Sequence, residues 1–170
     1  MFAKFSNKLY QALMFGACLA MVAAFVSIGL GVIAREAGWN IQGLDAYAGY
    51  SIAAALFLAL PSTLKQGDHI RVTLISQRLS ERSRRLLEHF CLFAGTALAG
   101  YIAYFACRLV WISRTTHDVS QGADATPLWI PQLFMAIGAL GFLVAFIDAW
   151  LHHVRRDAYY VVSDEAARVE

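Results

Sequence analysis

Charge is scarce in this chain. Charged residues make up 15% of its 170 residues, whereas soluble domains carry about 25%. Hydrophobic residues make up 59%, an excess that a water-soluble core cannot bury but a lipid bilayer can hold. The net charge at pH 7 is only +2, which does not indicate nucleic acid as a partner. The composition therefore predicts an integral membrane protein.

Cysteines and intramembrane charges are also few. The 3 cysteines, Cys18, Cys91 and Cys107, lie in apolar stretches and lack the spacing of metal ligands. They predict no disulfide, metal site or resident cofactor. The stretch 12–34 carries no charged side chain, whereas small multidrug exporters typically depend on an acid in their first helix. That class of transporter is not indicated, and no pattern of catalytic residues predicts an enzyme.

Four long apolar runs occupy most of the chain, at about 12–34, 44–64, 88–112 and 128–151. Each is near the ~20 residues that cross a bilayer as a helix. The connections and the tail 152–170 are too short for a soluble domain, so residues 1–170 are expected to form a single all-α membrane domain. The first run is longer than the roughly 7–15 apolar residues of a signal peptide, and we expect a retained helix.

Lysine and arginine are distributed very unequally between the connections. Short loops rich in these residues remain in the cytoplasm. Eleven of the 14 would lie on one side: Lys4, Lys8, Lys65, Arg71, Arg78, Arg82, Arg84, Arg85, Arg155, Arg156 and Arg168. The other side has Arg35 and Arg114, with Arg108 just inside the third span. Both termini and the central connection are therefore predicted to be cytoplasmic.

The central connection, about 65–87, is basic and moderately apolar. Ile70, Leu74 and Ile75 lie near one helical face, and arginines flank them. A helix of this kind lies in the membrane interface, where its basic residues attract anionic lipids. We therefore expect an amphipathic interfacial arm between the second and third spans. The alternative is a plain loop that only fixes topology.

Three charged residues are possible intramembrane charges. Asp45 and Arg108 are both placed near the outer surface, where they either form a pair or Arg108 extends its head group to the interface. Asp148 lies one turn before the inner end of the fourth span. An ion pair or interfacial exposure is favoured there over a proton or sodium relay, because coupling sites usually need broken helices at the midplane.

The start of the fourth span has its own pattern, Thr126-Pro-Leu-Trp-Ile-Pro131. A threonine cap followed by proline at the first helical position is typical of a helix start. We therefore expect Thr126 to cap the fourth helix, with Pro127 as its first residue and Trp129 at the outer interface; Pro131 belongs to the same helix entry.

The motif of the central connection resembles a known family. Its strings are Lys-Gln-Gly-Asp-His-Ile-Arg-Val-Thr-Leu-Ile at 65–75 and Arg-Leu-Ser-Glu-Arg-Ser-Arg-Arg-Leu-Leu-Glu at 78–88. They resemble the small, DctQ-like membrane subunit of tripartite ATP-independent periplasmic (TRAP) transporters, and the start of the fourth span does too. The matching positions in the connection are Lys65, His69, Ile70, Arg71, Val72, Arg78, Arg82, Arg84 and Arg85. The chain departs from the family at Thr73, where relatives often carry an acid, and at Ser80 and Glu81, where they often have prolines.

The resemblance implies a role and partners. A small TRAP subunit lies in the bacterial inner membrane and supports a large permease subunit, which carries an organic acid and usually sodium. A periplasmic binding protein delivers the substrate. The alternative function is a membrane anchor of a redox complex that holds haem between His89 and His152.

Overall fold

The computed structural model describes residues 2–39, 41–66, 81–122 and 124–155, without the side chains of residues 2–5, 81, 82, 84 and 155. Four long helices account for most of it: α1 (Phe2–Glu36), α2 (Leu44–Gln66), α4 (Glu81–Thr115) and α5 (Trp129–Arg155). All four are long and apolar enough to cross a membrane. The prediction of an all-α protein with four spans is confirmed.

The helices extend beyond the predicted spans. Residues 65–66 continue α2, residues 81–87 form the first turns of α4, and residues 152–155 end α5. Hydropathy marks the part of a helix that suits lipid, whereas arginine, glutamate and leucine favour further helical turns in water. Both ends of the predicted arm therefore belong to helices, α2 and α4, and its centre, 67–80, lies outside the described residues.

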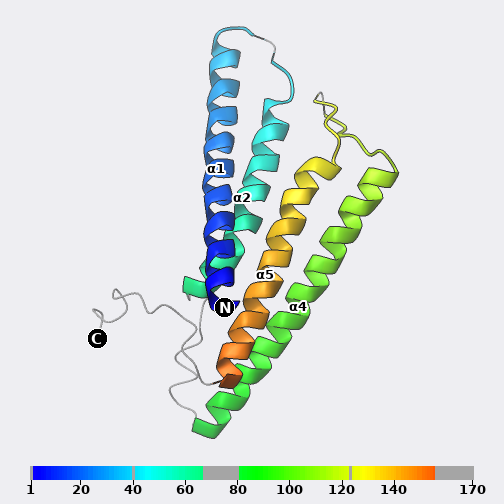
Figure 1. Ribbon diagram of the computed structural model, residues 1–170. Helices are drawn as coiled ribbons and strands as arrows, with labels where there is room; N and C mark the ends of the chain where they lie inside the picture. Colours follow the sequence, from blue (N-terminus) through cyan, green and yellow to red (C-terminus); the bar gives the residue numbers. More distant parts are fainter. Residues whose placement is uncertain (1, 40, 67–80, 123, 156–170) are drawn as a thin grey trace, which may run out of the picture.

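The helices are arranged as two antiparallel hairpins, α1–α2 and α4–α5 (Figure 1). Helix α1 packs on α2, α2 packs on α5, and α5 packs on α4, while α1 touches α5 only slightly. The spatial order is therefore α1, α2, α5, α4, with α1 and α4 at the edges. The apolar stretch of α2 has 39% of its residues buried and that of α4 only 11%, so most of the α4 surface faces outward.

Small residues set the distance between the hairpins. A Cβ atom added at Gly138 of α5 would lie 2.5 Å from the backbone carbonyl of Phe57 in α2, and one at Gly141 would lie 2.6 Å from Leu13. Such contacts let helix backbones approach closely in a membrane. Pro61 lies buried in the same region, and α2 continues through it to Gln66.

We call the end of the helix layer at which α1 begins its inner end and the opposite end its outer end. A glycine closes α1 at the outer end. Gly38 has a φ of 69°, and its N–H donates to Arg35 O at 3.3 Å while Trp39 N–H donates to Ala34 O at 2.8 Å. This pair of hydrogen bonds satisfies two carbonyls that the helix end leaves open. The chain then turns into α2, which begins at Leu44.

Candidate functional site

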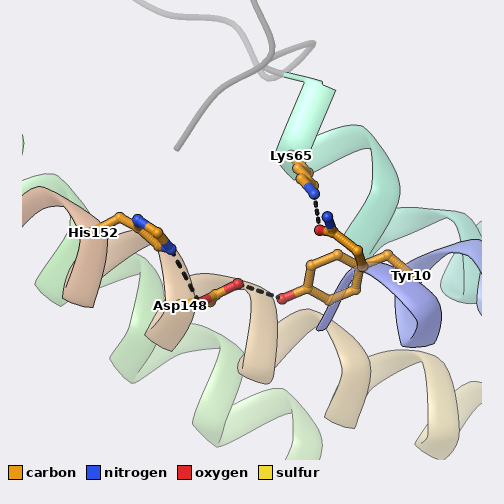
Figure 2. A network of polar contacts seen from close by, with 5 residues as sticks. Tyr10, Lys65, Asp148 and His152 are labelled. Carbon is orange, nitrogen blue, oxygen red and sulfur yellow. Dashed lines mark hydrogen bonds and ion pairs between the residues drawn. The ribbon is translucent and has the colours of Figure 1, made fainter. Parts of the chain in front are cut away.

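The clearest polar network joins the two hairpins at the inner end. Tyr10 of α1 donates its hydroxyl hydrogen to Asp148 Oδ2 of α5 at 3.2 Å, and His152 Nε2 lies 3.7 Å from Asp148 Oδ1, one turn along α5. Figure 2 shows the Asp148 carboxylate between these two side chains. The Asp148 side chain is only 13% exposed. A mostly buried carboxylate is stabilised by such partners, so this network holds α1 against α5.

Helix α2 is tied into the same network. Ser62 donates to the backbone carbonyl of Tyr10 at 3.0 Å, in a buried position. Lys65 Nζ donates to Asn7 Oδ1 and lies 5.8 Å from the centre of the Tyr10 ring (Figure 2). Lys65, which the sequence assigned to the arm, therefore belongs to the last turn of α2 and fixes the inner end of the first hairpin.

A second inner cluster lies between α4 and α5. Trp150 Nε1 donates to His89 Nε2 at 3.4 Å, and the His89 ring lies 5.9 Å from that of His153. His153 Nδ1 is 3.7 Å from Glu88 Oε2. His89 thus faces Trp150, whereas His152 faces Asp148, so the pair proposed for haem belongs to two different clusters. This arrangement does not favour the haem alternative.

The other basic motif residues are placed only in part. Arg82, Arg84 and Arg85 lie in the first two turns of α4, and the Arg85 side chain is exposed. His69, Ile70, Arg71, Val72 and Arg78 lie outside the described residues.

The outer end has a carboxylate of its own, Asp124 in the loop between α4 and α5. Ser120 donates to Asp124 Oδ1 at 2.8 Å, and Tyr50 of α2 donates to Oδ2 at 3.2 Å. The hydrogen bond from Ser120 is the main cause that lowers the pKa of Asp124 below its usual value. Gly43, with a φ of 89°, lies so close that a Cβ there would be 2.8 Å from Asp124 Cβ. The loop is therefore held against the first hairpin.

The start of the fourth helix differs from the prediction. Helix α5 begins at Trp129 rather than at Pro127, and the Thr126 hydroxyl donates to Tyr47 OH of α2 at 3.1 Å. The threonine therefore bonds to another helix instead of capping its own. Pro131 lies in the first turn of α5, where a missing N–H costs no helical hydrogen bond. Arg114 Cζ lies 5.6 Å from the centre of the Trp129 ring.

Asp45 and Arg108 are not brought together. Asp45 is in the first turn of α2, whereas Arg108 is on α4, which packs against α5 rather than α2. The Arg108 guanidinium lies 6.0 Å from the centre of the Phe105 ring on its own helix. Of the two alternatives for Arg108, the geometry favours the one without an ion pair to Asp45.

The sequence can now be compared with known families. Residues 24–156 match the family described as tripartite ATP-independent periplasmic transporters, DctQ component. The chain belongs to this family. No curated protein shows significant similarity to it. This DctQ-family protein is thus a multi-pass membrane component of a TRAP transporter, as the central motif indicated.

Sequence reasoning missed several residues of the DctQ-family protein that the structure brings together. Tyr10 and Ser62 at the inner end, and Tyr50 and Asp124 at the outer end, were not singled out. What these residues share in the sequence is a polar side chain close to the end of an apolar run. At the same depth, a second helix also has a polar side chain. Asp148 was singled out with an ion pair or interfacial exposure as the expectation, whereas its partners are Tyr10 and His152.

Proposed function

We propose that this chain is the stationary scaffold of a TRAP transporter for organic acids. It would support the large permease subunit in the bacterial inner membrane and work with a periplasmic substrate-binding protein. The match to the DctQ family over residues 24–156 is the observation that carries the proposal. The ion that drives uptake, which we expect to be sodium, would bind to the large subunit.

The distribution of polar groups supports a scaffold role. Two described carboxylates that accept a hydrogen bond from the other hairpin, Asp124 and Asp148, lie near the two ends of the hairpins, and the middle of the α2–α5 contact is made by glycine and apolar side chains. Transport sites usually combine broken helices with polar groups at the midplane, whereas α2 and α5 run unbroken through it.

Reconstitution tests this role. Liposomes holding this chain alone should take up no organic acid. Liposomes that also hold the cognate large subunit should do so when the binding protein and an ion gradient are present. Uptake of substrate by the chain alone would refute the scaffold role, and failure of the wild-type chain to co-purify with the large subunit would refute the partnership.

The proposed orientation places both termini and the connection 67–80 in the cytoplasm. It is supported by the excess of lysine and arginine on that side. Reporter fusions after Gly38 and Gln121 should be periplasmic, and fusions after Gln77 and Arg168 cytoplasmic. A periplasmic reporter after Gln77 would overturn this layout.

We also propose that the basic residues between the second and third spans attract anionic lipids, each by about 1 kcal/mol near the membrane surface before screening. Replacing Arg78, Arg82, Arg84 and Arg85 together with glutamine should lower the yield of assembled transporter. Normal assembly of that variant would show that these charges serve topology alone.

A further inference from the structure

Helix α4 has two opposite faces of different composition. The face toward α5 carries small residues, because the buried residues Ala99 and Ala103 lie one turn apart on it. A Cβ atom added at Gly95 would lie 2.4 Å from the ring of Phe146 in α5. This face is filled by the chain's own helix.

The opposite face carries four large residues, three of which have polar side-chain atoms. Tyr101, Tyr104, Phe105 and Arg108 follow the spacing i, i+3, i+4 and i+7, which places them on one side of a helix. Tyr101 and Tyr104 are 63% and 64% exposed, and Arg108 is exposed as well. The Phe105 ring lies 4.5 Å from that of Tyr101 and 5.2 Å from that of Tyr104. We call these four residues the outer stripe of α4.

The depth of the outer stripe matters for its chemistry. The apolar part of α4 runs from Arg85 to Thr115, and at 1.5 Å per residue Tyr101 lies about 21 Å from its outer end, near the middle. Acyl chains accept no hydrogen bonds, so a phenol hydroxyl facing them loses its partners in water without replacement. Arg108 lies about 10 Å from the same end. The stripe therefore fits a protein surface with hydrogen-bond acceptors better than it fits lipid tails.

The helix at the other edge offers the contrast. The exposed large side chains of α1 include Leu19, Val22, Phe25 and Ile33, none of which has a polar atom. Such a surface is suited to acyl chains along its length. The two edges of the helix layer thus differ in the surroundings that they fit.

We infer that the outer stripe of α4 is the surface on which the large permease subunit docks, an inference that rests on the proposed function. The expected counterpart is a membrane helix of that subunit with carbonyl, hydroxyl or carboxylate oxygens from its midplane to its outer half. The phenols of Tyr101 and Tyr104 and the guanidinium of Arg108 donate to these oxygens. The i, i+3, i+4, i+7 spacing is that of a helix docked along another surface.

A pair of matched variants tests the assignment. Ala97 lies one turn before Tyr101 on the same side of α4, and Ala23 lies on α1; both are exposed. Ala97→Trp adds bulk to the outer stripe and should lower co-purification of the cognate large subunit at least tenfold. Ala23→Trp adds the same bulk to a lipid-facing position and should leave co-purification unchanged. Circular dichroism and gel filtration of each variant alone check that both fold.

Removal of the hydroxyls provides a second measurement that leaves the shape intact. The double variant Tyr101→Phe, Tyr104→Phe should weaken the apparent affinity for the large subunit roughly threefold per hydroxyl, the usual effect of a hydrogen bond between membrane helices. Equal recovery of the large subunit with wild type, Ala97→Trp and the double phenylalanine variant would overturn the inference and leave the proposed function standing. Loss of binding in Ala23→Trp alone would assign the docking surface to α1. A wild-type chain that binds no large subunit would overturn both.

Discussion

The contact between the two hairpins is built differently at its middle and at its ends. At the middle, Gly138 lets the α5 backbone approach the carbonyl of Phe57 in α2. At the ends, tyrosine hydroxyls bind carboxylates: Tyr10 binds Asp148 on the inner side, and Tyr50 binds Asp124 on the outer side.

The difference follows from the solvent at each depth. In hydrocarbon an unpaired polar group is costly, so close packing of backbones and apolar side chains is the safer way to join helices. Near the head groups, water can hydrogen-bond to a carboxylate while the two hairpins approach each other. Packing thus sets the distance between the hairpins, and the polar contacts at the ends set their register along and around one another.

The largest expected effect comes from the middle. Gly138→Val places atoms where the backbone of Phe57 lies, and backbone cannot rotate away. We expect a loss of about 3 kcal/mol or more in the free energy of unfolding, measured by thermal unfolding in detergent. Gly49→Val is the control, since a Cβ at Gly49 meets nothing within 4 Å and valine has a slightly better helix propensity than glycine. Equal destabilisation by the two variants would contradict the close approach.

A smaller effect is expected at the inner end. Asp148→Asn keeps an oxygen that accepts from Tyr10 but removes the charge beside His152. The variant should lose about 1 kcal/mol of stability, and the assembled transporter should keep most of its uptake activity. Tyr10→Phe should cost a similar amount. Uptake abolished in Asp148→Asn, with stability little changed, would instead indicate a proton or ion relay at this carboxylate.

The smallest effect is expected at the outer end, where the loop carboxylate is only partly buried. The hydrogen bond from Ser120 lowers the pKa of Asp124 below 3.8, so its contribution is present above that pH and is lost as the pH falls through the lowered value. Protection of the Ser120 and Gly122 amides from hydrogen exchange should therefore be equal at pH 7 and pH 5. Ser120→Ala should reduce protection at both. A loss of protection between pH 7 and pH 5 in the wild type would show that another group holds the loop.

The helices could be predicted because the length of each apolar run matches the thickness of the bilayer that it crosses. Their ends were not, since arginine and glutamate at 81–85 suit a helix in water as well as a loop. The cap at Thr126 was predicted from local pattern alone, but α5 begins at Trp129, and the Thr126 hydroxyl donates to Tyr47, 79 residues away in the chain. Local pattern cannot include a partner from another helix.

The polar contacts between the hairpins could not be predicted from the sequence, for a related reason. Tyr10 and Asp148 are 138 residues apart, and four apolar helices give little periodicity from which to read how each is rotated. Gly138, Gly141 and Ala145 form a row of small residues at helical spacing, and the structure places its glycines against α1 and α2. What the row could not tell is whether its partner is this chain or another.

The unequal lengths of the helices have a consequence for the surrounding lipid. The membrane-crossing parts of α1 and α4 are 31 residues each, about 46 Å, whereas that of α2 is 23 residues, about 34 Å. A hydrophobic core of ~30 Å fits the short helix nearly upright, while the long ones tilt, thicken the bilayer or extend their charged ends beyond it. The long helices α1 and α4 form the two edges of the helix layer. A change in bilayer thickness therefore acts first on these edge helices and reaches α2 and α5 only through them. Changing the acyl chain length should therefore alter the tilt of α1 more than that of α2.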